Sequence, residues 1–195
     1  MSAKNDNSAV IKAVIIIISA AVIIFLIFNF MLKKNGSTDQ SGEKETLTPV
    51  EEITTIDLST SYPTSPTAVV ELYSKIMQVM YKYDYTDDEF SKMANVLGGL
   101  FDDELMANQV NYPSGIKSDV TQKKTDDYAI STYTVQSASD ISYTQVDGYD
   151  VAYVQCIYAV RHSTATQSTV YLFVLRKDSA GLWKIYGWTS ENADE

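Results

Sequence analysis

Apolar residues form one continuous run near the amino end and recur periodically through the rest of the chain. Residues 13–32 hold fourteen Val, Ile, Leu and Phe and contain no charge, proline or glycine. As a helix this run is about 30 Å long, the thickness of the hydrocarbon layer, and it satisfies its own backbone hydrogen bonds there. We therefore expect a transmembrane helix at 13–32, preceded by a short cytoplasmic tail at 1–12.

The sequence that follows this apolar run bears on its retention and orientation. Residues 28–34 lack the small residues of a signal-peptide cleavage site, so we expect a permanent single-pass anchor with the lipid bilayer as its partner. Lysines flank both ends of the run in nearly equal number, so the excess of positive charge that normally marks the cytoplasmic side does not decide the orientation. Residues 33–61 are rich in Ser and Thr and net acidic, as in an exported stalk. We therefore expect the larger part of the chain to lie outside the cytoplasm, at the cell membrane.

Aromatic residues indicate where a folded domain begins. All fourteen tyrosines and both tryptophans lie at or after Tyr62, so we expect a globular domain at 62–190 and an acidic tail at 191–195. The single cysteine, Cys156, excludes an intramolecular disulfide, so this domain must be stabilised by a hydrophobic core. Because Cys156 lies in an alternating apolar run, we interpret it as a small buried residue rather than a nucleophile.

Three helices are predicted in the first half of this domain. Ser65 followed by Pro66 is typical of a helix start, and apolar residues then recur every three or four positions to about residue 81. Thr86 and Glu89 fit a capping box for a second helix, which Gly98 and the next glycine should end. A third short helix is expected at 100–108.

After residue 128 the apolar period changes to two, which predicts strands. Asp147 and Gly148 fit a two-residue hairpin turn between two of them. Strands are expected near 128–135, 141–146, 149–162, 168–177 and 182–189. This order predicts an α+β fold, in which three helices pack on one side of a strongly curved four- to five-stranded antiparallel sheet.

Two resemblances extend this prediction. The order of elements from Tyr62 to Trp188 resembles the nuclear-transport-factor-like superfamily, which has a cystatin-like cone with a pocket at its open end. Tyr62-Pro63, the run 69–73 and the ending 181–188 resemble an uncharacterised family of single-pass membrane proteins from Gram-positive bacteria. The family resemblance implies one anchor, one cone-like domain and no assigned activity. The superfamily includes scaffold subunits of conjugative secretion systems as well as isomerases and dehydratases, so the fold alone leaves an enzyme open.

Charge and residue types argue against several kinds of site. Residues 63–195 hold ten Lys or Arg against eighteen Asp or Glu without a basic stripe, which excludes nucleic acid as a favoured partner. The acidic clusters 87–89 and 102–104 fit the first turns of helices better than calcium ligands. One histidine, His162, and one cysteine cannot form a zinc site, and His162 is expected to be solvated at a strand end. We therefore predict no catalytic residue, no cofactor and no metal.

An aromatic set is the one candidate for a binding site. If the sheet encloses a pocket, these side chains can line it, although core packing accounts for most of them. The set consists of Tyr73, Met77, Tyr81, Phe101, Tyr158, Tyr171, Phe173 and Trp188. The leading hypothesis is a non-catalytic extracytoplasmic domain that binds a protein partner, associates with itself or acts in envelope assembly. The alternative is a small-molecule-binding or isomerase-like enzyme that uses the cone pocket.

Overall fold

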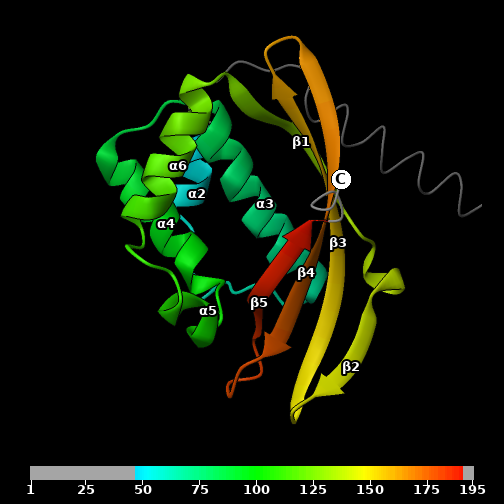
Figure 1. Ribbon diagram of the computed structural model, residues 1–195. Helices are drawn as coiled ribbons and strands as arrows, with labels where there is room; N and C mark the ends of the chain where they lie inside the picture. Colours follow the sequence, from blue (N-terminus) through cyan, green and yellow to red (C-terminus); the bar gives the residue numbers. More distant parts are fainter. Residues whose placement is uncertain (1–46, 191–195) are drawn as a thin grey trace, which may run out of the picture. The chain divides into compact units, whose positions relative to one another are not determined.

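Residues 47–190 are the part of the chain that the computed structural model describes, and they form a five-stranded antiparallel sheet with helices on one face (Figure 1). The predicted α+β class is therefore correct. Within residues 47–190, no helix combines the length and apolar character needed to cross a bilayer. The span expected at 13–32 lies outside the described residues, as do the tails expected at 1–12 and 191–195.

Two helices begin and end where the capping residues predict. In α3 (Pro66–Lys82), the Ser65 side chain accepts a hydrogen bond from the Ala68 amide. In α4 (Asp87–Gly99), Thr86 and Glu89 form the expected capping box. The third helix, α5 (Asp103–Ala107), is shorter than predicted because Asp102 caps it and the preceding residues extend along the sheet.

Two further helices were not predicted. Within the expected stalk, α2 (Pro49–Thr54) starts at a capping box of Thr48 and Glu51, and it buries Val50 and Ile53 in the core. The packed body thus begins before Tyr62. The other helix, α6 (Ser114–Thr125), buries only Val120, so its sequence carries little of the periodicity that identifies a helix.

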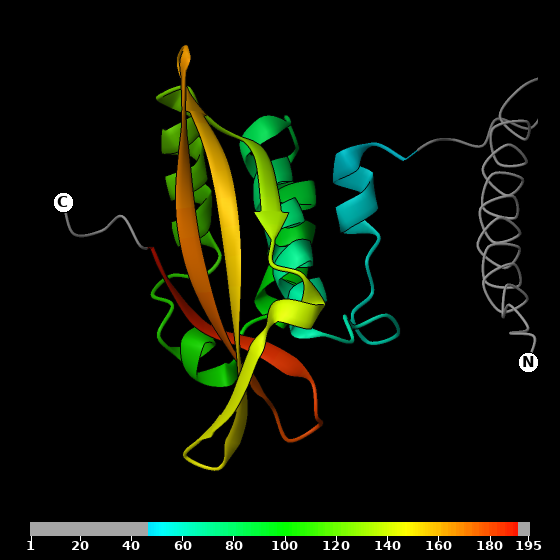
Figure 2. The same cartoon turned by 90° about the vertical axis from the view of Figure 1, so that its right-hand side faces the viewer.

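The strands match their predicted positions closely. They are β1 (Tyr128–Val135), β2 (Ser142–Val146), β3 (Tyr149–His162), β4 (Ala165–Lys177) and β5 (Trp183–Ser190). The order is β1-β3-β4-β5, and β2 pairs with the first part of β3, so β1 and β2 follow one another along the same edge (Figure 2). Asp147 and Gly148, both at positive φ, form the predicted hairpin turn. A short 3-10 helix at Ala138–Asp140 joins β1 to β2.

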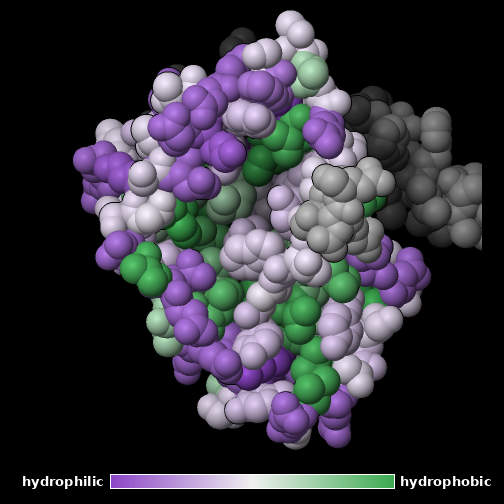
Figure 3. Space-filling view, in the orientation of Figure 1, coloured by the Kyte–Doolittle hydropathy of each residue, from purple (hydrophilic) through white to green (hydrophobic). Residues whose placement is uncertain are grey.

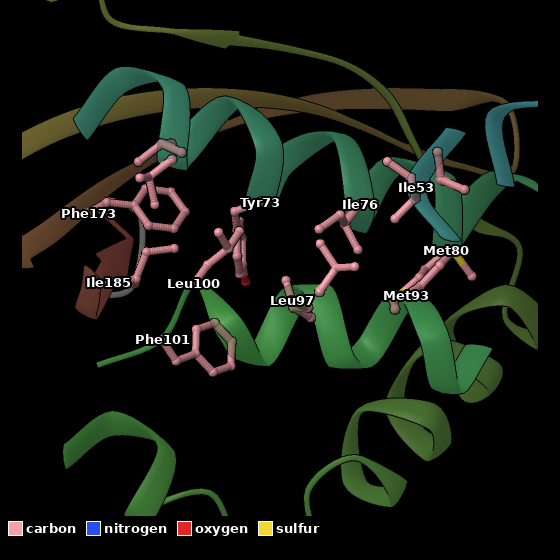
Figure 4. Close-up of a cluster of buried hydrophobic side chains, with 14 of the residues drawn as sticks. Ile53, Tyr73, Ile76, Met80, Met93, Leu97, Leu100, Phe101, Phe173 and Ile185 are labelled. Atoms are coloured by element: carbon pink, nitrogen blue, oxygen red, sulfur yellow. The ribbon is translucent and has the colours of Figure 1, made fainter. Parts of the chain in front are cut away.

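The core lies between α3 and the two layers that flank it. Toward α2 and α4, Ile76 and Met80 meet Ile53, Met93 and Leu97, all without solvent exposure (Figure 4). Toward the sheet, the side chains that are at most 1% exposed come from β3, β4 and β5. They are Ala152, Val154, Cys156, Phe173, Leu175 and Ile185.

Register shifts bend the sheet at two places, between Ile130 and Thr132 in β1 and between Val174 and Leu175 in β4. Beside the second shift, Leu100 and Asp102 exchange backbone hydrogen bonds with Ile185 of β5, so the Phe101 segment continues the sheet past its last strand. These features position the walls of the cavity described next.

Candidate functional site

A cavity of about 560 Å³ opens between α3 and α6 on one side and the inner face of the sheet on the other. In the space-filling view, apolar surface is exposed along this opening and is bordered by hydrophilic surface (Figure 3). Its aromatic and apolar lining comes from α3 and all strands except β2. These residues are Tyr73, Met77, Tyr81, Tyr128, Ile130, Tyr158, Val160, Ala165, Tyr171, Phe173 and Trp188.

Three aromatic rings from three different elements form one wall of the cavity. The Tyr73 ring of α3 lies 5.2 Å from the Phe173 ring of β4 and 5.5 Å from the Trp188 ring of β5, and those two lie 5.9 Å apart. Tyr73 and Phe173 are buried, whereas Trp188 is 39% exposed. Trp188 therefore keeps an uncovered face that a ligand can contact.

The deep end of the cavity is fixed by a buried polar cluster. The Tyr158 hydroxyl lies 2.6 Å from Ser74 Oγ, which in turn lies 3.5 Å from the Cys156 sulfur. Burial raises the pKa values of both Tyr158 and Cys156, so both groups stay protonated at neutral pH. Cys156 is buried as predicted, and this cluster orients the Tyr158 ring, which meets Tyr171 edge-on at 5.4 Å.

Ionisable groups gather at the mouth of the cavity, and α6 supplies two of them. Asp119 accepts a hydrogen bond of 3.4 Å from the Tyr81 hydroxyl, and Lys123 Nζ lies 4.9 Å above the Tyr128 ring. Burial, followed by the nearby Asp119 charge, raises the pKa of Tyr81. His162 stacks on Tyr128 with ring centroids 4.2 Å apart. It is exposed, as expected, but it lines the mouth of the cavity as well.

Most of the aromatic set proposed from the sequence meets at this site. Seven of its eight members line the cavity, and the eighth, Phe101, lines an adjoining cavity of about 250 Å³. Four residues belong to both cavities: Tyr73, Met77, Asp119 and Trp188. Sequence reasoning missed Asp119 and Lys123 because they lie on α6, the helix without a clear apolar period.

The two acidic clusters act as helix starts. Residues 87–89 occupy the first turn of α4, as predicted. In the second cluster, Asp102 caps α5 and also accepts hydrogen bonds of 2.7 and 2.6 Å from Arg176, while Glu104 accepts one of 3.0 Å from the same guanidinium. Within residues 47–190, no three His, Cys, Asp or Glu side chains gather in a way that could hold a metal ion.

The ion pair between Arg176 and Asp102 ties the end of the Phe101 segment to β4, the neighbour of β5. The Arg176 guanidinium lies between the rings of Tyr149 and Tyr186, at 4.6 and 4.3 Å. Burial is the largest single influence and would raise the pKa of Asp102. The hydrogen bonds from Arg176 and from the Glu104 amide, together with the Arg176 and Lys184 charges, outweigh it and hold that pKa below its usual value. The contact is therefore a charged clamp that stabilises one wall of the smaller cavity.

Comparison with known proteins gives a family. Residues 1–188 match the family described as Domain of unknown function (DUF6715), so the chain belongs to it. This agrees with the resemblance to an uncharacterised family, whereas the membrane anchor and the cone shape stay predictions. No curated protein matches the chain.

Proposed function

We propose that this member of a family described as a domain of unknown function is a membrane-tethered binding protein that holds a small ligand in its aromatic cavity. The observation that carries the proposal is the wall of Tyr73, Phe173 and Trp188, of which Trp188 stays partly uncovered. Ligand sites are typically concave, mostly apolar and about 300–1,000 Å³ in volume, with a few polar groups that orient the ligand. A cavity of about 560 Å³ with Asp119, Lys123 and His162 at its mouth fits that description.

The tether and the shape of the body are parts of the same proposal. The apolar run 13–32 would anchor the chain, and its acidic, Ser- and Thr-rich continuation would place the body outside the cytoplasm. A bent antiparallel sheet around α3 with a pocket on its inner face supports a nuclear-transport-factor-like cone. Protease added to intact cells should remove the body from the membrane; digestion only after lysis would contradict the orientation.

Binding can be tested by NMR of the full chain in a nonionic maltoside micelle, because its two tryptophans report separately. Trp188 lines the cavity, whereas Trp183 is buried beside Tyr143 and lines neither cavity described above. A set of small apolar, aromatic and amphipathic compounds is titrated while both indole N–H resonances are followed. We expect at least one class to shift Trp188 and leave Trp183 in place. Equal movement of both resonances, or of neither with every compound, would contradict a cavity ligand.

An isomerase-like enzyme is the second candidate, and the ionisable groups at the mouth favour keeping it. Asp119 and His162 both line the cavity, and both side-chain types serve as general acids or bases in enzymes. A ligand found by NMR would then be converted, and Asp119→Asn would abolish turnover. Recovery of the ligand unchanged after prolonged incubation with the chain would leave binding as the function.

Self-association or assembly with an envelope protein is compatible with a tethered binding body. Crosslinking in intact cells, followed by light scattering of the purified full chain, would distinguish a homo-oligomer from a complex with a partner. A strictly monomeric chain without a crosslinked partner would leave the cavity ligand as the sole binding function.

A further inference from the structure

Resting on the proposed function, we infer that the cavity ligand is a small organic cation whose ammonium group binds where the two cavities meet, with Asp119 as its counter-ion. The residues common to both cavities are two aromatic side chains, one thioether and one carboxylate: Tyr73, Trp188, Met77 and Asp119. This composition suits an organic cation, because ring faces and a carboxylate both attract positive charge and the thioether adds polarisable contact.

The aromatic side chains provide more than apolar area. Each ring has a negative face, so several rings around one space attract a cation more strongly than an alkane of the same size. Arg and Lys side chains of this body already use such faces elsewhere. Lys184 lies 4.4 Å above the Tyr62 ring, and Arg176 lies between two tyrosine rings.

The cavity itself already holds one ammonium group against a ring. Lys123 Nζ lies 4.9 Å above Tyr128, at the mouth. Asp119 precedes Lys123 by four residues on α6, an order and spacing that would allow an ion pair along the helix. In the structure, however, Lys123 contacts the Tyr128 ring and does not pair with Asp119. Among the described residues, no cation lies within ion-pair distance of Asp119. Its one hydrogen bond to a side chain is the long contact with the Tyr81 hydroxyl. The carboxylate thus presents its charge to the cavity.

The net negative charge of residues 47–190 also favours a cationic ligand. Residues 47–190 contain ten Lys or Arg and eighteen Asp or Glu, so the average field attracts cations and repels anions. An anionic ligand would have to approach Asp119 within this acidic body. A neutral ligand would use the rings but could not form an ion pair with the carboxylate.

The test compares choline with its neutral isostere, in which carbon replaces the quaternary nitrogen. Both are titrated into the full chain in maltoside micelles, with benzyltrimethylammonium as a larger cation, while the indole resonances of Trp188 and Trp183 are followed. We expect choline to bind at least about tenfold more tightly than its isostere, a difference of about 1.4 kcal/mol, and benzyltrimethylammonium more tightly still. Only the Trp188 resonance should move.

Two variants on α6 should have opposite effects. Asp119→Asn keeps the shape of the side chain but removes the counter-ion, and we expect it to weaken choline binding about tenfold without changing the affinity of the isostere. Lys123→Gln removes the ammonium that competes for the mouth, and we expect it to strengthen choline binding severalfold. Asp126→Asn is the matched control, because it removes one negative charge at the end of α6 without touching the cavity lining. It should leave both affinities unchanged.

The outcomes separate this inference from the proposed function. Equal binding of choline and its isostere, or an equal loss in Asp119→Asn and Asp126→Asn, would overturn the cation site while leaving a binding cavity. If neither these probes nor the apolar and aromatic compounds move the Trp188 resonance, the proposed function fails together with the inference.

Discussion

The two apolar stripes of α3 contrast in what they face. Val69, Ile76 and Met80 are fully buried, and the latter two pack against aliphatic side chains of α2 and α4 (Figure 4). Tyr73, Met77 and Tyr81 recur every four residues on the neighbouring stripe and line the cavity. The packed stripe carries no hydroxyl group, whereas the open stripe carries the hydroxyl groups of its two tyrosines. One helix thus divides its apolar surface between stability and a space that a ligand can fill.

The largest expected effect comes from breaking the packed stripe. Ile76→Ala should lower the free energy of unfolding by about 3–4 kcal/mol, because the deletion leaves a cavity among fully buried neighbours. Urea unfolding of the chain measures the change. Ile76→Val, which removes one methylene, should cost about 1 kcal/mol. A loss below 1 kcal/mol for the alanine variant would contradict the description of this stripe as close-packed.

A smaller loss is expected outside both stripes, at the clamp on the Phe101 segment. Asp102→Asn should cost about 2 kcal/mol, because it leaves the mostly buried Arg176 with only the more exposed Glu104 as a carboxylate partner. Asp88→Asn, which disturbs the exposed pair with Lys92, is the control and should cost less than about 0.5 kcal/mol. Equal losses of unfolding free energy in the two variants would show that the Asp102–Arg176 pair does not stabilise the fold.

The same clamp predicts a dependence on pH. Because the folded-state pKa of Asp102 is lowered, its stabilisation is complete above the ordinary carboxyl pKa of about 3.9 and is lost as pH falls through the lowered value. The difference in unfolding free energy between the native chain and Asp102→Asn should therefore be constant from about pH 5 to 7 and shrink below about pH 4. A difference that grows on acidification would contradict this assignment.

On the open stripe, deletions should cost less than on the packed one. Met77→Ala should lower the unfolding free energy by about 1 kcal/mol, since Met77 already borders empty space on one side and loses fewer contacts. Urea unfolding compares the loss of unfolding free energy in Met77→Ala with the loss in Ile76→Ala. Equal costs for the two would erase the contrast between the stripes.

The smallest effect is expected at the hydroxyl of Tyr81. Its bond to Asp119 is long, at 3.4 Å, so Tyr81→Phe should change the unfolding free energy by less than about 0.5 kcal/mol. The raised pKa of Tyr81 should delay its ionisation beyond that of the exposed tyrosines, and comparing the alkaline absorbance titrations of the native chain and the variant isolates this group. A loss of more than 1 kcal/mol would show that the mouth is part of the packed core.

The packed elements could be predicted from the sequence more completely than the mouth of the cavity. The strands and α3 and α4 follow from period, caps and turn residues, all of which are local properties. The short α2 is only six residues long, too short for a helical period to be recognised, and its two buried side chains lie in a stretch rich in Ser and Thr. The aromatic wall could be named from alternation, but the mouth could not, because Asp119 and Lys123 reach it through a helix whose surface is polar nearly all round. Long-range placement of that helix decides the chemistry of the site.

The central claim, that the cavity holds a ligand and is not a packing gap, is tested most directly by filling it. Thr169 and Ser168 are neighbours on β4 that point to opposite faces of the sheet, and only Thr169 lines the cavity. Thr169→Trp should abolish the ligand-induced shift of the Trp188 resonance while the chain stays folded, whereas Ser168→Trp should leave the shift intact. Unchanged ligand binding in Thr169→Trp, with Trp183 still in its native position, would contradict the account.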